Sequence, residues 1–471
     1  MFLTQKFAAF IAGLTCEKLP PEAISQAKER IMDTVGAALA GRGNWEYARN
    51  LEQVGLSLGT GDYSIIGAPG RRFPAARAAM IDAVYAHSLE LDDGHKNAGC
   101  HAGAVVVPTA LVMGQALGRT GREVIAAVAA GYEVTYRIAA HVNPNQINRG
   151  FHPSSNCGVY GAAAAAGYLM GLNAEQLAAA LGQAGMLASG TMEATRSGQR
   201  SKCVQVGNAA YNGIFAAYLA QSGMEGCLSA LEGKDGLFQT QSADVDVEDV
   251  CRGLGEVYSI GDTYNKLYPC CRHAQPGIEG VLDLAREHSI HPEEVERIQI
   301  GTHQVAYDLT GHIAEPKNAG EAKFSLAYGA AAALVDGGFG VGHLTEQSYT
   351  KPEILALARR VACSIDPEVQ AAFPARRGAR VTIQMKDGAV YQKELYDLKG
   401  SPRNPVGWPE LEEKFRRNAE LLLPEAAVDQ LVRDFRELDT MERIDPVMEL
   451  LSEEAPPLPR SSPDTAGGSA G

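Results

Sequence analysis

The stretch AARAAMIDAVYAHSLELDDGHKNAGCH, residues 75–101, joins an apolar run to a cluster of ionisable groups. The apolar run, residues 75–89, is rich in alanine and predicts a helix buried in the protein core. The cluster that follows, from Glu90 to His101, contains three carboxylates and two imidazoles in twelve residues. Because burial of such groups costs free energy unless they pair or take part in chemistry, the segment predicts either a satisfied polar network at a helix end or a catalytic site.

Helical patterns extend on both sides of this stretch, from residue 1 to about residue 265. Many of these runs carry Ala or Gly at three- or four-residue spacing, which indicates close helix packing. The pattern changes after about residue 270: residues 295–302 alternate like a strand, and residues 380–394 predict a hairpin with an Asp-Gly turn. Helical patterns return between residues 409 and 439.

These patterns predict a mainly α protein with three parts. A large all-helical domain is formed by both chain ends, residues 1–268 and 403–452. A smaller α+β lid domain, residues 269–402, is inserted into it, and its size suits one domain. The tail, residues 453–471, is rich in Pro, Ser, Gly and Ala and is predicted to be disordered.

The charge and cysteine content narrow the classes of function. A net charge of −14 argues against binding to nucleic acid or to anionic membranes, since both require a basic face. No apolar run approaches the roughly 20 residues that a membrane span needs. The nine cysteines are scattered without a disulfide framework, which fits a reducing compartment. We therefore expect a cytoplasmic protein that binds neither nucleic acid nor membranes.

Four further segments concentrate basic, imidazole or hydroxyl groups. Each also has an ordinary structural interpretation, as a capping loop, a solvated loop, a linker or a helix start. The segment at residues 266–273 lies where the helical pattern gives way to the α+β segment, and so near an interdomain cleft, where ligands often bind. The segments are RGFHPSSN (149–156), RSGQRSKCVQVGNAA (196–210), KLYPCCRH (266–273) and KFSLAY (323–328).

The sequence contains no phosphate loop and no dinucleotide-binding glycine motif after a strand. His95 and His101 lie beside Asp92 and Asp93, and these residue types can ligate a metal. Their spacing matches no specific metal motif, so we predict no metal site.

Taken together, these segments resemble the MmgE/PrpD family, whose members include 2-methylcitrate dehydratases, cis-aconitate decarboxylases and an iminodisuccinate epimerase. The resemblance extends from IMDTVG (31–36) through LEGKDG (231–236), KFSL (323–326) and RNP (403–405) to EKF (413–415). It implies a helical domain built from both chain ends, a smaller α+β lid, a homodimer, and an active site between the domains without a cofactor or required metal. It also implies chemistry that begins with proton removal next to a carboxylate of a small polycarboxylate.

The resemblance also assigns catalytic residues by position. His101 matches the histidine that follows the family's Asp-Asp pair, and His152 matches the histidine of its Gly-aromatic-His loop. Lys202 matches the lysine before a Gly-x-Ala-Ala helix, and Lys266 matches the lysine of a Lys-x-Tyr-Pro motif. Tyr328 matches an aromatic hydroxyl contributed by the lid.

In the expected mechanism, His152 or His101 takes the proton, which suits neutral pH because the reference pKa of histidine is about 6.5. Lys202, Lys266 and an arginine pair with substrate carboxylates and stabilise the enediolate-like charge. The predicted substrate-binding residues are Arg149, Arg200, Arg272, His273, Glu90 and Asp93.

The chain departs from the family pattern at several positions. Decarboxylase-like members carry an aspartate in place of Glu90 and a threonine in place of Gly94, and many members have a histidine in place of Gln275. His101-Ala102 also replaces the usual His-Pro. These changes make decarboxylation less expected. We rank a 2-methylcitrate-dehydratase-like lyase first and an epimerase of an iminodisuccinate- or succinate-like substrate second; a cis-aconitate-type decarboxylase and a non-catalytic binding protein remain alternatives.

Overall fold

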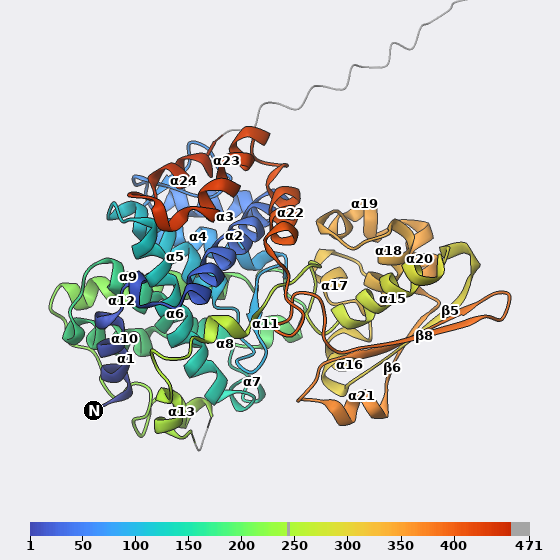
Figure 1. The fold of residues 1–471 in the computed structure, drawn as a ribbon, viewed down its shortest axis with the longest axis horizontal. Helices are drawn as coiled ribbons and strands as arrows, with labels where there is room; N and C mark the ends of the chain where they lie inside the picture. Colours follow the sequence, from blue (N-terminus) through green and yellow to red (C-terminus); the bar gives the residue numbers. More distant parts are fainter. Residues whose placement is uncertain (243–244, 454–471) are drawn as a thin grey trace, which may run out of the picture.

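A computed structural model describes residues 1–242 and 245–453, and it confirms the mainly α class with a small sheet-containing region. Figure 1 shows helices from both ends of the chain gathered in one body, with the sheet and its helices beside it. The predicted boundaries near residues 268 and 402 stay predictions. The predicted disordered tail lies outside the described residues from residue 454 onward.

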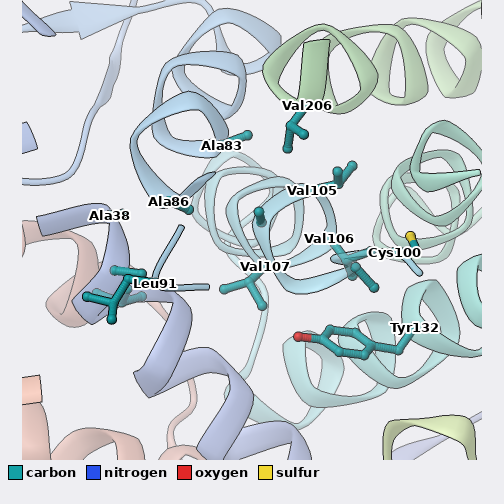
Figure 2. Packing of buried hydrophobic residues seen from close by; sticks show 14 of the residues in the cluster. Ala38, Ala83, Ala86, Leu91, Cys100, Val105, Val106, Val107, Tyr132 and Val206 are labelled. Atoms are coloured by element: carbon teal, nitrogen blue, oxygen red, sulfur yellow. The ribbon is translucent and has the colours of Figure 1, made fainter. Parts of the chain in front are cut away.

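The helical body is built around α4, which confirms the helix predicted from residue 75. Small residues bring its neighbours close: a Cβ on Gly41 would lie 2.1 Å from the carbonyl oxygen of Tyr85, and a Cβ on Gly207 would lie 2.4 Å from Cγ2 of Val84. Figure 2 shows alanines of α4 within this core together with valines of α5. The helices of the body are α1 (Leu3–Gly13), α2 (Pro21–Asn44), α3 (Ala48–Ser57), α4 (Ala75–Ser88), α5 (Gly103–Ala116), α6 (Gly121–Val142), α7 (Asn145–Asn148), α8 (Pro153–Asn156), α9 (Gly158–Leu169), α10 (Ala174–Leu187), α11 (Glu193–Arg196), α12 (Val204–Gln221), α13 (Leu237–Gln241), α14 (Val247–Cys251), α22 (Trp408–Ala419), α23 (Glu425–Arg436) and α24 (Asp445–Leu450).

The sheet-containing region has four strands in the order β6-β5-β7-β8. Strand β5 pairs parallel to β6 and antiparallel to β7, and β7 pairs antiparallel to β8. The predicted strand at residues 295–302 and the predicted hairpin are both confirmed, whereas β6 was not anticipated. The elements are α15 (Gln275–His288), β5 (Val295–Thr302), α16 (Gln304–Thr310), α17 (Ala319–Lys323), α18 (Leu326–Asp336), α19 (Glu346–Tyr349), α20 (Pro352–Ala358), β6 (Val361–Ile365), α21 (Pro367–Ala372), β7 (Ala379–Met385) and β8 (Val390–Leu395).

The helical body also contains two pairs of very short strands. One pair, β1 (Tyr63–Ser64) with β2 (Arg72–Phe73), lies close to α4. The other, β3 (Gly94–His95) with β4 (Thr263–Tyr264), ties the ionisable cluster to the segment just before the sheet-containing region. Within residues 1–242 and 245–453, no helix combines the length and apolar character needed to cross a membrane.

Candidate active site

The antiparallel pairing of β3 with β4 brings two distant segments together. Gly94 lies opposite Tyr264, and His95 lies opposite Thr263. Lys266 follows β4 by two residues, and its side chain is only 1% exposed. The pairing therefore carries the lysine of the KLYP segment into the cluster that follows α4.

Glu90 lies between two lysines that come from different parts of the chain. Its carboxylate accepts a hydrogen bond from Nζ of Lys202 through Oε1, and Oε2 lies 3.2 Å from Nζ of Lys266. Burial alone would raise the pKa of Glu90, but the two ammonium groups hold it well below its usual value. Glu90 also has a φ of 55°, a left-handed conformation that a non-glycine residue adopts at an energetic cost. This turn ends the α4 segment and directs the carboxylate between the lysines.

Three imidazoles lie beside this ion cluster. The ring of His87, in the last turn of α4, is 5.1 Å from the ring of His101 and 6.0 Å from that of His152. Burial lowers the pKa of His101 to about 3 although Asp92 opposes the shift. Burial, followed by the charge of Lys202, holds the pKa of His152 well below its usual value. His101 and His152 are therefore neutral near pH 7, the state in which an imidazole accepts a proton.

The tautomer of His101 follows from its partner. Its Nδ1 contacts the main-chain carbonyl oxygen of Asp93, and because a carbonyl can only accept, Nδ1 carries the hydrogen. Nε2 then keeps its lone pair. Nδ1 of His87 is held in the same way by Oδ2 of Asp92, at 2.7 Å. The segment thus fixes two imidazoles in defined orientations.

Asp92 and Asp93 connect these imidazoles to the protein core. Both carboxylates are fully buried. Asp93 accepts from the hydroxyl of Tyr132 at 2.6 Å and from the amide of Gly103 at 3.2 Å, and burial raises its pKa to about 7 despite Arg30 nearby. Asp93 was predicted to bind substrate, and this stays a prediction; its carboxylate is bonded to the first residue of α5 and to Tyr132 in the core.

The other predicted residues lie in several places. Arg149 donates to the carbonyl oxygens of Gln239 and Thr240, and the hydroxyl of Tyr328 donates to the carbonyl oxygen of His343 at 2.7 Å, so neither is held in the cluster. Arg200 pairs with Glu46 at 2.5 Å but also lines the pocket beside Glu90.

Two more of the predicted residues lie apart from Glu90. The ring of His273 packs 5.2 Å from that of His303, and burial holds the pKa of His273 well below its usual value. Arg272 lines a separate cavity described below.

Two functional candidates went unrecognised in the sequence. Lys323 lines the same pocket as Glu90, and its Nζ donates to the carbonyl oxygen of Ser88 at 2.7 Å. His87 was hidden in an apolar run, although its position five residues before Asp92 is a usable signal. The pocket itself has a volume of about 10 Å³, which is near the minimum for one water molecule, and Glu90 and Lys202 are among the residues that line it.

Among the described residues, one group has the geometry to hold a metal ion. Ligand atoms of His87, Asp92 and His101 lie within 4.8 Å of one another. Nζ of Lys266 lies 3.9 Å from Oδ1 of Asp92, and its positive charge opposes a second cation at that position. The set is therefore better suited to proton transfer than to metal binding.

We expect the buried imidazoles to make the protein unstable in weak acid. His95 is one of them: burial lowers its pKa to about 4 in the folded state, against about 6.5 when unfolded. As pH falls below 6.5, the unfolded state takes up a proton that the folded state does not, so stability is lost down to about pH 4. The maximum effect is about 1.4 kcal/mol per pH unit for each such group. The buried or half-buried imidazoles with lowered pKa are His95, His101, His152, His273 and His303.

Urea unfolding at pH 7, 6 and 5 measures this effect. His95→Gln should flatten the decline of the unfolding free energy with falling pH, while the same change at the exposed His291 serves as the matched control. An identical decline in the unmodified protein and in His95→Gln would contradict the prediction.

Comparison with known proteins places this geometry in a family. The model of the MmgE/PrpD N-terminal domain matches residues 5–249, and that of the MmgE/PrpD C-terminal domain matches residues 268–438. The chain is 27% identical to cis-aconitate decarboxylase of Homo sapiens, over 97% of this chain and 95% of the relative. It is 27% identical to cis-aconitate decarboxylase of Aspergillus terreus, over 96% of each chain. Since the two family models together span most of the sequence, the chain belongs to the MmgE/PrpD family.

Proposed function

We propose that the chain is a lyase that forms and stabilises negative charge on a carbon next to a carboxylate of a small di- or tricarboxylate, most simply as a dehydratase. One observation carries the proposal. The neutral imidazole of His101, with its tautomer fixed by the carbonyl oxygen of Asp93, lies beside the buried ammonium groups that hold Glu90. A base and two fixed cations are the groups that proton removal from such a carbon needs.

The first step is substrate binding at the lysines. A substrate carboxylate reaches Lys202 and Lys266 by displacing the carboxylate of Glu90, which now fills the space between them. The first carboxylate replaces the charge of Glu90, and the further carboxylates of the substrate add negative charge that raises the pKa of the neighbouring imidazole and strengthens it as a base. Nε2 of His101 then takes the proton, and the two ammonium groups stabilise the enediolate-like charge without reorganising.

The dehydratase reaction also needs an acid for the departing hydroxyl. Lys323 lines the same pocket, and burial lowers the pKa of its ammonium group. A lysine with a lowered pKa gives up its proton more readily than an ordinary one. Lys323 is therefore our candidate acid, with His152 as the neighbouring imidazole that orients the substrate.

A second candidate function is decarboxylation of a cis-aconitate-like tricarboxylate. It is favoured by the names of the relatives, which match nearly the full length of the chain. In that reaction a carboxylate leaves as carbon dioxide, and the electron pair that stays on carbon takes a proton. The same lysines would stabilise the carbanion, so the two candidates differ in the bond that breaks.

Incubating the protein with candidate di- and tricarboxylates in deuterated water separates the possibilities. A dehydratase produces an alkene that absorbs near the ultraviolet edge, and a decarboxylase releases carbon dioxide. Deuterium exchange with inversion, without alkene or carbon dioxide, would replace the lyase by an epimerase. The homodimer implied by the family resemblance is a further proposal, which sedimentation would test.

Replacing His101 by glutamine is expected to lower kcat/KM by about 10² to 10⁴, the usual contribution of a positioned general base. The amide can still contact the carbonyl oxygen of Asp93 but cannot take a proton. His303→Gln is the matched control, because that imidazole stacks on Phe373 in the sheet-containing region. Turnover that survives undiminished in His101→Gln would reject His101 as the base.

A further inference from the structure

A second and larger cavity lies where the helical body meets the sheet-containing region. Its volume is about 300 Å³, and it is lined by parts of the segments 95–97, 262–272, 375–377 and 396–403. It shares no lining residue with the pocket beside Glu90. A cavity of this size is at the lower end of the range that binds small molecules.

The lining of this cavity is strongly basic although the protein as a whole is acidic. Only two carboxylates, Asp262 and Asp397, face five cationic side chains there. This is the opposite of the chain's net charge of −14, so the cations are concentrated locally. The five are Lys96, Arg272, Arg376, Arg377 and Arg403.

Most of these cations have no carboxylate partner. Arg272 donates to the carbonyl oxygen of Asn265 at 3.2 Å and to Oε1 of Gln275 at 2.6 Å, and Arg377 donates to the carbonyl oxygen of Lys96 at 2.8 Å. Nε of Arg377 is buried and has no hydrogen-bond partner within the described part of the chain.

Ion pairs are equally scarce at this cavity. Across residues 1–242 and 245–453, no carboxylate lies within 4.0 Å of the charged groups of four of the five, Arg376 being paired with Asp397 at 3.5 Å. Buried lysines elsewhere differ: Lys414 lies 2.6 Å from Asp33, and Lys266 lies 3.2 Å from Glu90.

Even partly buried cations without counter-charge are unfavourable, because the loss of hydration is not offset by an ion pair. In agreement, burial lowers the pKa of Arg272, of Arg377 and of Lys96 from their ordinary values. An anion entering the cavity would supply the missing charge and accept from the free Nε of Arg377. Guanidinium groups suit carboxylate and phosphate oxygens particularly well.

Tyr264 adds a neutral hydrogen-bonding group to the cavity. Its ring lies under the guanidinium of Arg272, with 4.7 Å between the guanidinium carbon and the ring centroid. Its hydroxyl makes no hydrogen bond within the described residues, although the side chain lines the cavity. A ligand oxygen can therefore be bound by cations and by a hydroxyl at once.

We propose that this cavity binds a small, multiply charged carboxylate or phosphate anion through Arg272, Arg377 and Lys96, with Arg403 at its exposed rim. The inference goes beyond the proposed function, since the cavity is separate from the lysine and imidazole cluster. The anion can come from two sources: the distal end of the di- or tricarboxylate substrate, or a separate anionic effector.

Isothermal titration calorimetry of the full chain tests the proposal with acetate, succinate, citrate and pyrophosphate at low salt. We expect the association constant to rise with ligand charge. Arg377→Met should lower the association constant for citrate at least tenfold, and the exposed Arg403→Met, which is safe for folding, at least threefold. Arg359→Met, at an exposed arginine that pairs with Glu315, is the matched control. No binding of citrate or pyrophosphate at millimolar concentration, or unchanged binding in both cavity variants, would overturn the proposal.

Lys266→Met separates this inference from the proposed function. The variant should lose turnover but keep citrate binding, because Lys266 does not line the cavity. Loss of citrate binding in Lys266→Met would relocate the anion to the cluster around Glu90 and reject the cavity site. Calorimetry needs no turnover, so the site can be established even if the proposed lyase reaction is wrong.

A kinetic comparison identifies the source of the anion. If the cavity holds the distal end of the substrate, citrate competes with substrate and Arg377→Met raises KM. If it holds an effector, citrate or pyrophosphate changes the rate without competing with substrate. Either pattern supports an anion site in the cavity, provided that it disappears in Arg377→Met.

Discussion

Lys266→Met is expected to lower turnover about 10² to 10³-fold, and to lower the free energy of unfolding by about 3–5 kcal/mol. Both effects have one cause. The ammonium group of Lys266 is buried, lies 3.2 Å from Glu90 and 3.9 Å from Asp92, and has its pKa raised by these two carboxylates in spite of burial. Methionine keeps the shape of the side chain but leaves the carboxylates with less counter-charge. It also removes a fixed cation from the carbon that becomes negative in the reaction.

The matched control is Lys414→Met. Lys414 is also buried, with Nζ 2.6 Å from Asp33 and 3.0 Å from the carbonyl oxygen of Leu91. Its loss should destabilise the protein to a similar degree while the groups around Glu90 keep their cations. Turnover should therefore fall far less than in Lys266→Met when both variants are assayed well below their melting temperatures.

A double variant separates stability from chemistry. Adding Glu90→Gln to Lys266→Met removes the carboxylate that was left short of counter-charge, so part of the stability should return. Turnover should not return, because the cation is still missing. Unfolding in urea gives the stability of each variant, and the kcat of each gives the chemistry. If Lys266→Met and Lys414→Met lose turnover equally, Lys266 acts through stability and not at the reacting carbon.

The fold could be predicted from the sequence where the patterns are long. The alanine-rich run before Glu90 and the alternation of residues 379–395 each span several turns or residue pairs, and both form the predicted elements. Strands β3 and β4 have two residues each and carry no periodicity, so no pattern could reveal their pairing. Yet that pairing joins the cluster to Lys266, so the long-range geometry of the site depends on the elements that sequence patterns miss.

At the candidate site, the sequence predicted which residues come together better than it predicted the directions of their side chains. His101, His152, Lys202 and Lys266 were predicted from four separate segments, and the structure brings them together around Glu90. In the segment KFSLAY (323–328), nearness in sequence did not give the direction of the side chains, because Lys323 and Tyr328 lie on two successive helices, α17 and α18.

Lys323 and Tyr328 illustrate the point. Lys323, at the end of α17, reaches the pocket, whereas Tyr328, in the first turn of α18, turns its hydroxyl to His343. His87 was missed because a histidine within an apolar helix is usually an ordinary core residue, and its burial became informative only once Asp92 was seen to hold its ring.

The second prediction with a large expected effect concerns substitution of Gly94. A Cβ at this position would lie 2.5 Å from the hydroxyl oxygen of Tyr264 and 2.7 Å from its Cζ, both closer than real contacts. Gly94→Thr should therefore lower the free energy of unfolding by about 1–3 kcal/mol through overpacking against the buried ring. Gly338→Thr is the control, because a Cβ there would meet no atom within 4 Å and the backbone is not left-handed.

A double-mutant cycle with Tyr264→Ala shows whether this clash is the cause. Tyr264→Ala is itself destabilising, but it empties the space that a threonine at position 94 would occupy. Gly94→Thr should then cost at least about 1 kcal/mol less in the Tyr264→Ala background, measured by urea unfolding. Equal costs in the two backgrounds would show that position 94 requires glycine because of its backbone conformation and not because of the contact with Tyr264.

The cycle also bears on how the chain departs from its relatives. The threonine of decarboxylase-like members suggested that Gly94 removes a polar group from the site. The structure places the hydroxyl of Tyr264 where that side chain would begin, and burial raises the pKa of this hydroxyl although the charges of Lys266, Arg377 and Arg272 oppose the shift. A hydroxyl from β4 thus occupies the place where a side chain at position 94 would begin, and it lines the basic cavity. A strong coupling in the cycle would make Gly94 and Tyr264 the first pair to test for an effect on substrate selectivity.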